Sequence, residues 1–150
     1  RVTSIDISAQ ALQLAQRNTA LNEYSGVHET LCGDAFSLLQ QLIERGVCYD
    51  IVVIDPPSFA KSAKGVDLAL NKYESLARLG LQLVSKKGWL ILASCSSRVA
   101  MNQFLAAHRQ AFSTHKSIKF KLIETTEHDL DHAVGFEHGH YLKTAYYKHQ

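Results

Sequence analysis

Proline, methionine and tryptophan are scarce in this chain. Of its 150 residues, two are proline, one is methionine and one is tryptophan. No segment has the biased composition of a flexible linker or a low-complexity region. No apolar run approaches the ~18 residues that a transmembrane helix requires, and the first residues do not form a signal peptide. We therefore expect a globular, cytoplasmic protein.

Cysteines are also few. Cys32, Cys48 and Cys95 are too widely spaced for a disulfide framework or a zinc knuckle. Their number is typical of a reducing compartment. Cys32 and Cys48 fall within or just before expected strands, so we expect both to be inert core residues.

Charge of either sign is not in excess. The net charge is +2 with histidine neutral, and the isoelectric point is about 8.5. This mildly basic balance is compatible with a nucleic-acid partner but does not establish one. The hydrophobic content of 46% is ordinary for a globular protein, and the length suffices for one domain, expected over residues 1–150.

The most informative stretch is residues 49–59. Ile51 to Ile54 is an apolar, β-branched run without alternation, which, with its neighbours, is typical of a central parallel strand buried on both faces. Asp55, Pro56 and Pro57 follow, and the prolines force an extended turn. Because ligands of open α/β sheets bind beyond the carboxyl ends of the strands, Asp55 lies where chemistry is usually done. The alternative is a plain Pro-Pro stop, with Asp55 capping the turn.

Strand and helix patterns alternate along most of the chain. We expect strands at residues 2–5, 27–31, 49–54, 89–93, 118–124 and 141–147, and helices at 9–21, 35–44, 68–84 and 100–112. Ser8 and Asp34 are expected helix N-caps, and Gly46 and the Lys86-Lys87-Gly88 run are expected helix ends. The alternation predicts an α/β fold with a doubly wound, mostly parallel sheet. No helix separates the last two strands, so the last one should be antiparallel.

Three successive strands end in an acid, namely Asp6, Asp34 and Asp55. Carboxyl ends of parallel strands lie at one edge of a sheet, so these acids should line one rim. Such acids can accept hydrogen bonds from ribose hydroxyls or from an adenine amino group. The alternative is that each acid caps the helix that follows it. For Asp34 alone the two interpretations are equally supported, whereas the trio favours an adenosine-binding rim.

A larger set of motifs, in this order and spacing, resembles a known family. The motifs are Ile5-Asp6 with Ser8, Arg17-Asn18, Leu21-Asn22, Gly33-Asp34-Ala35-Phe36, Asp55 to Ser62, Ala93 to Ser97, Leu130-Asp131-His132 and Gly139 to Lys143. They resemble the bacterial 23S ribosomal RNA large-subunit methyltransferases of the 5-methylcytosine type, which are class I enzymes using S-adenosylmethionine (SAM). The resemblance covers nearly the whole chain. Asp-Pro-Pro-x-Phe and Ser-Cys-Ser are specific together and weak separately.

The resemblance implies a role for each matching residue. Asp6, with Ile7 beside it, would hold the ribose of SAM, and Asp34 would contact the adenine. Asp55 would lie beside the transferred methyl group and the target base, and Cys95 would be the nucleophile. The remaining implied residues are Ala35, Phe36 and Pro56 at the cofactor, and Pro57, Phe59, Lys61 and Tyr73 at the RNA. Aromatic core packing for Phe59 and Tyr73, and a solvated surface position for Lys61, stay open as alternatives.

Cysteine suits this chemistry because a thiolate is a strong nucleophile and can also leave again. Added to carbon 6 of cytosine, it makes carbon 5 able to attack a sulfonium methyl group. Asp55 could hydrogen-bond the base edge at N3 and the amino group. The target base must leave its stack to reach a pocket. The alternative for Cys95 is a small buried hydrophobic residue.

The chain departs from the pattern in one respect. The glycine-rich turn that holds the methionine end of SAM, together with the first strand, is absent before Arg1. We therefore expect a C-terminal catalytic-domain fragment. The missing strand would lie at the centre of the sheet, so two strand edges should be unpaired. Such a chain could pair with a second copy as a homodimer or a strand-exchanged dimer, and should bind SAM weakly or not at all by itself.

Two other functions remain open. The same scaffold with Asp-Pro-Pro could methylate guanine, which does not require a cysteine. Without a glycine-rich turn, the chain could instead be a non-catalytic RNA-binding or dimerising module. A metal site is not expected, because nothing completes the His-x-His spacing of His138 and His140, with His132 nearby.

Overall fold

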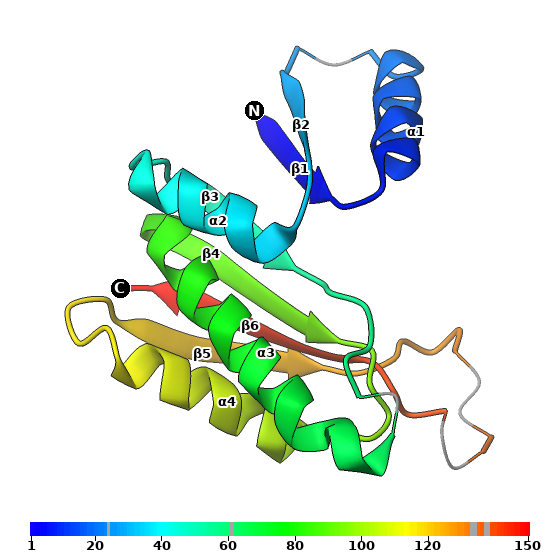
Figure 1. The fold of residues 1–150 in the computed structure, drawn as a ribbon, viewed down its shortest axis with the longest axis vertical. Helices are drawn as coiled ribbons and strands as arrows, with labels where there is room; N and C mark the ends of the chain where they lie inside the picture. The colour runs from blue at the N-terminus through cyan, green and yellow to red at the C-terminus, as the bar shows by residue number, and fades with distance from the viewer. Residues whose placement is uncertain (24, 61, 133–134, 137–138) are drawn as a thin grey trace. The chain divides into compact units, whose positions relative to one another are not determined.

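The structure, a computed structural model, describes residues 1–23, 25–60, 62–132, 135–136 and 139–150 (Figure 1). The chain divides into two compact units, Arg1–Gly46 and Val47–Gln150, and each is described by itself. The single domain expected over residues 1–150 stays a prediction. No described helix is both long and apolar enough to cross a bilayer.

Unit 1 combines a two-stranded parallel sheet with two helices. Its elements are β1 (Val2–Asp6), α1 (Ala9–Ala20), β2 (His28–Cys32) and α2 (Ala35–Glu44). Both predicted N-caps are confirmed: the Ser8 hydroxyl accepts from the Ala11 amide at 3.2 Å, and Asp34 Oδ1 accepts from the Ser37 amide at 2.9 Å. Gly46, with φ +67°, lies just beyond the end of α2, as glycine commonly does.

Unit 2 is built on a four-stranded sheet in the order β3-β4-β6-β5. Its elements are β3 (Tyr49–Ile54), η1 (Ala63–Gly65), α3 (Val66–Gly80), η2 (Leu81–Leu83), β4 (Val84–Ser94), α4 (Met101–Ser113), β5 (Phe120–Thr126) and β6 (Lys143–His149). Strands β3 and β4 are parallel, whereas β6 is antiparallel to both β4 and β5. The antiparallel last strand is therefore confirmed. Helices α3 and α4 pack together along the sheet (Figure 1).

The core of unit 2 lies between this sheet and its helices. Leu90 and Ala145, on adjacent strands, are fully buried, as is Phe104 of α4. The Phe104 ring lies between those of Tyr73 and His108, with centroids at 5.2 and 4.1 Å. Aromatic side chains thus fill much of the space beneath the sheet.

Strand β3 differs from the expectation in its burial. Val52 is buried, but Ile51 and Val53 are 58% and 61% exposed, so the strand is covered on one face and not on both. Within the described residues, β1 pairs only with β2 and β3 only with β4. The two unpaired strand edges that were expected are therefore present.

The end of α3 was predicted wrongly. The helix ends at Gly80, and strand β4 already begins at Val84, so Lys86, Lys87 and Gly88 belong to a strand. Lys87 has φ 62°, and a Cβ on Gly88 would lie 2.8 Å from the Asp50 carbonyl oxygen. This glycine allows the close approach of β3 and β4, and does not terminate a helix.

Candidate active site

Unit 1 presents Asp6 at the carboxyl end of β1. Asp6 pairs with Cys32, and its carbonyl oxygen accepts from the Gly33 amide at 3.0 Å. Its side chain is exposed, and Oδ1 accepts from the Ser8 amide at 2.7 Å. This bond orients the carboxylate at the end of the strand, next to exposed Ile7.

Asp34, just after β2, acts as a helix cap. Oδ1 accepts from the amide and the hydroxyl of Ser37, at 2.9 and 3.0 Å. The capping interpretation is thus confirmed, and an additional adenine contact stays a prediction. Ala35 and Phe36, the first residues of α2, are both half-buried.

In unit 2 the thiol of Cys95 meets the Asp-Pro-Pro segment. Ile54 pairs with Leu92, so Asp55 and Cys95 both follow the carboxyl ends of neighbouring parallel strands. Cys95 Sγ donates to the Pro56 carbonyl oxygen at 3.8 Å. The thiol is half-buried and Asp55 is exposed. The strand pairing therefore brings together the two motifs that the sequence separates by about 40 residues.

The other two cysteines are not core residues. Cys32 and Cys48 are both exposed, contrary to expectation. Cys32 ends a strand that, among the described residues, has one neighbour, and its Sγ donates to the Ile7 carbonyl oxygen at 3.7 Å. Cys48 precedes β3. Exposure alone therefore does not distinguish Cys95, but its position beside Pro56 does.

Tyr73 supports the turn that carries Cys95. It is 3% exposed, its ring lies 5.2 Å from that of Phe59, and its hydroxyl accepts from Ser94 Oγ at 2.8 Å. Burial raises the pKa of Tyr73, and the negative charges of Cys95 and Asp55 act in the same direction. The position favours the core-packing alternative for Tyr73 over direct contact with a base.

The other residues expected at the RNA are less enclosed. Pro57 is exposed and Phe59 is half-buried, with the Lys72 ammonium 4.9 Å from its ring centroid. Lys61 lies outside the described residues. Contact of all three with RNA stays a prediction.

Lys143 was not expected beside Cys95. Its side chain is only 4% exposed, and its Nζ donates to the carbonyl oxygens of Ser96 and Tyr141 at 2.8 and 2.9 Å. Burial lowers the pKa of Lys143. The sequence holds one signal of this burial. Lys143 alternates with Ala145 and Tyr147, and all three lie on the buried face of β6.

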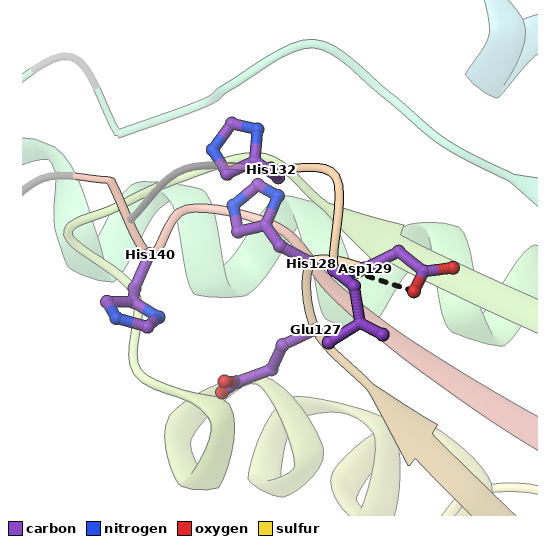
Figure 2. A pocket seen from close by; sticks show the side chains of 6 residues that line it. Glu127, His128, Asp129, His132 and His140 are labelled. Carbon is purple, nitrogen blue, oxygen red and sulfur yellow. Dashed lines mark hydrogen bonds between the residues drawn. The ribbon is translucent and has the colours of Figure 1, made fainter. Parts of the chain in front are cut away.

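A histidine pair lines a cavity of about 260 Å³ in the segment between β5 and β6 (Figure 2). The rings of His128 and His132 stack with centroids 3.7 Å apart, while His140 lies apart from them. His128 Nε2 accepts from the amides of Tyr141 and Leu142, at 3.2 and 3.1 Å. No group of three potential metal ligands occurs in the described part of the chain, and His138 lies outside it.

Sequence comparisons identify relatives with a common name. The chain is 38% identical over 146 residues to "Ribosomal RNA large subunit methyltransferase" of Deinococcus radiodurans. It is 31% identical over 146 residues to "Ribosomal RNA large subunit methyltransferase I" of Shewanella frigidimarina. These matches cover 97% and 95% of this chain but only 36% of each relative, so the chain spans about a third of their length. No protein-family model matches the chain.

Solved structures establish the fold. A protein described as a methyltransferase and crystallised with S-adenosylhomocysteine (SAH) superposes with a TM-score of 0.77 at 27% identity. A protein described as a SAM-dependent methyltransferase from Streptococcus mutans gives the same score at 26% identity. Each match covers 97% of this chain and 38% of the other. The chain therefore has the Rossmann-like α/β fold of SAM-dependent methyltransferases, with a mixed sheet.

Proposed function

We propose that this chain is part of a SAM-dependent methyltransferase that methylates carbon 5 of a cytosine in large-subunit ribosomal RNA, in the cytoplasm. The observation that carries the proposal is the 3.8 Å contact between the Cys95 thiol and the Pro56 carbonyl oxygen. It puts a nucleophile next to the Asp-Pro-Pro segment at the ends of adjacent parallel strands. The names of the relatives support the same substrate class and cofactor.

The strand ends of unit 1 fit the adenosine half of SAM. The exposed Asp6 carboxylate can accept hydrogen bonds from ribose hydroxyls, and Ile7 beside it is 77% exposed and can cover an apolar surface. Asp34, Ala35 and Phe36 would lie at the adenine. In unit 2, Asp55 and Pro56 would lie near the methyl group. When bound, SAM supplies an electrophilic methyl group on a sulfonium.

The proposed reaction uses the two residues at the ends of β3 and β4. The Cys95 thiolate adds to carbon 6 of cytosine, forming a carbon–sulfur bond, and the electron pair of the 5,6 double bond makes carbon 5 nucleophilic. One oxygen of Asp55 accepts a hydrogen bond from the amino group, and a proton held between the other oxygen and N3 stabilises the adduct. Once carbon 5 has taken the methyl group, which leaves SAH as the thioether, a base removes the proton of carbon 5, and the thiolate leaves as the double bond re-forms. The methyl group thus replaces that proton.

The remaining surface would serve the RNA and assembly. Pro57, Phe59 and Lys61 would contact the target nucleotide, while Tyr73 would support Phe59 from within the core. Among the strands that the structure describes, β1 and β3 each have an unpaired edge whose backbone groups could pair with a further strand. A second copy could supply that strand, as a homodimer or a strand-exchanged dimer.

The test uses the full-length protein and substrate RNA. We expect Cys95→Ala to reduce 5-methylcytosine formation at least ~10³-fold, the loss seen when a covalent nucleophile is removed, as measured by mass spectrometry of digested RNA. Cys32→Ala and Cys48→Ala, at the two exposed cysteines, are the matched controls and should remain active. RNA containing 5-fluorocytosine should form a covalent adduct with the parent protein and not with Cys95→Ala, because fluorine cannot be removed as a proton.

The alternatives predict different results. Methylguanine formation that survives Cys95→Ala would contradict the cytosine route and support the guanine-directed enzyme. RNA binding or dimerisation without any methylated product would contradict the enzymatic proposal altogether.

A further inference from the structure

Lys143 is a buried cation that, in the part of the chain the structure describes, has no acidic partner in contact. It is the first residue of β6, pairs with Ser94 across the sheet, and is 4% exposed. Within the described residues its ammonium forms no ion pair, and both of its hydrogen-bond acceptors are backbone carbonyl oxygens. Burying an ammonium with only neutral acceptors costs free energy of folding, so the presence of a lysine at this position needs a physical reason.

The two acceptors of Lys143 lie in different segments. Ser96 belongs to the turn after β4, directly after Cys95, and Tyr141 belongs to the segment before β6. The Tyr141 amide in turn donates to His128 Nε2. The ammonium therefore ties the cysteine turn to the segment that holds the stacked histidines.

Few other polar contacts hold the cysteine turn. Ser94 Oγ accepts from the Ser96 amide at 3.3 Å, and the Val99 amide donates to the Ser96 carbonyl oxygen at 3.3 Å. The Ser96 hydroxyl is buried without a hydrogen-bond partner among the described residues. At 2.8 Å, the bond from Lys143 is the shortest of those that reach Ser96.

The charge of Lys143 also acts on the site. Burial lowers the pKa of Lys143, and the negative forms of Glu127 and Cys95 oppose this effect. The bond from Lys143 Nζ to the carbonyl oxygen of Ser96, the residue after Cys95, keeps this positive charge beside the turn that carries the thiol. Glu127 directly follows β5, so its charge acts on Lys143 from a second segment without an ion pair between them in the described residues.

We propose that Lys143 is a positioning residue for Cys95: its ammonium fixes the Ser96 carbonyl, orients the turn that carries the thiol, and puts a positive charge beside that turn. This inference rests on the proposed function, because it assigns Lys143 to the nucleophilic step. It also concerns a property that can be measured without RNA or SAM, namely the reactivity of the Cys95 thiol.

The test measures alkylation of Cys95 by iodoacetamide in the full-length protein, in a Cys32→Ser, Cys48→Ser background. Lys143→Met removes the charge and the hydrogen bonds but keeps a side chain of similar size. Lys143→Gln removes the charge and keeps hydrogen-bond donors. We expect Lys143→Met to slow alkylation at neutral pH about 5- to 10-fold, because the turn that carries the thiol loses the ammonium and its bond to the Ser96 carbonyl oxygen. Lys148→Met, on the same strand, is the matched control and should alkylate like the parent.

Steady-state kinetics of methyl transfer then distinguish a positioning role of Lys143 from a general loss of structure. We expect Lys143→Met to lower kcat at least about tenfold while KM for SAM stays within twofold, and Lys143→Arg, which keeps the charge, to recover part of the loss. Parent-like alkylation and kcat in folded Lys143→Met would overturn the proposal. If Lys143→Met does not fold, parent-like alkylation in Lys143→Gln would overturn it. A slowed alkylation combined with activity that survives Cys95→Ala would instead contradict the proposed function and leave the positioning intact.

Discussion

The two units of this chain are held together in different ways. In unit 1 the buried apolar side chains are Leu12, Leu39 and Leu42, while Val2, Ile7, Leu14, Leu21 and Val27 are exposed. Unit 2 contains the remaining buried apolar residues, including Leu90, Phe104 and Tyr147. A two-stranded sheet is marginal by itself, whereas four strands covered by helices can form a stable core. Unit 1 thus depends on local hydrogen bonds and caps, and unit 2 on packing.

The largest expected effect is a loss of packing in unit 2. Leu90 is fully buried and Leu14 of unit 1 is 57% exposed, so the same substitution can be compared in both units. We expect Leu90→Ala to lower the free energy of unfolding by about 2–5 kcal/mol through lost burial and a cavity. Leu14→Ala should change it by less than about 0.5 kcal/mol. Equal effects of the two substitutions would contradict the distinction.

Denaturant titration with two probes measures this difference. Trp89, the single tryptophan of the chain, lies in β4, so its fluorescence reports on unit 2. Far-ultraviolet circular dichroism reports on the helices of both units. Leu90→Ala should shift the fluorescence transition to lower denaturant concentration, whereas Leu14→Ala should leave it in place.

Acid should destabilise unit 2 through His108. This side chain is 1% exposed, its Nδ1 lies 2.9 Å from the Tyr147 hydroxyl, and burial, together with the charge of Arg109, lowers its pKa to about 3. The unfolded chain therefore binds a proton between about pH 6.5 and 3 that the folded chain does not. Stability should be fully present above pH 6.5 and fall by about 2–3 kcal/mol on going to pH 4.5.

The control for the acid effect is a variant that cannot titrate. His108→Gln should lose stability at neutral pH, but its stability should vary much less between pH 6.5 and 4.5. His140→Gln, at an exposed histidine, should retain the pH dependence of the parent. A parent-like pH dependence in His108→Gln would show that another group is responsible. Trp89 fluorescence during urea titration at each pH gives the comparison.

The sequence predicted the elements of both units but not their burial. Caps such as Ser8 and Asp34 act on amides three residues away, so local sequence suffices to identify them. The end of α3 was missed because Leu81–Leu83 continues the apolar spacing as a 3-10 turn. The exposure of Ile51 and Val53 depends on which elements cover β3, which a β-branched run cannot specify.

The candidate site was predictable to the extent that strand order determines it. Parallel pairing of β3 and β4 puts Cys95 beside Pro56, as the two motifs indicated. The burial of Tyr73 and the position of Lys143 come from side chains that cross between elements. The burial of Lys143 could have been inferred only from its alternation with Ala145 and Tyr147, which places it on the buried face of the strand. Lysine is usually exposed, so composition alone gives no hint of this position.

The smallest expected effect concerns a cap in unit 1, and it separates stability from binding. Asp34→Ala should cost about 1 kcal/mol, because the Ser37 amide at the start of α2 loses its acceptor. Asp34→Asn should be nearly neutral, since asparagine caps helices as well as aspartate does. If Asp34 also contacts the adenine of SAM, calorimetry on the full-length protein should show weaker SAM binding in Asp34→Asn despite unchanged stability. Unchanged SAM binding in this variant would reduce Asp34 to a helix cap, whose contribution lies in the local structure that holds unit 1 together.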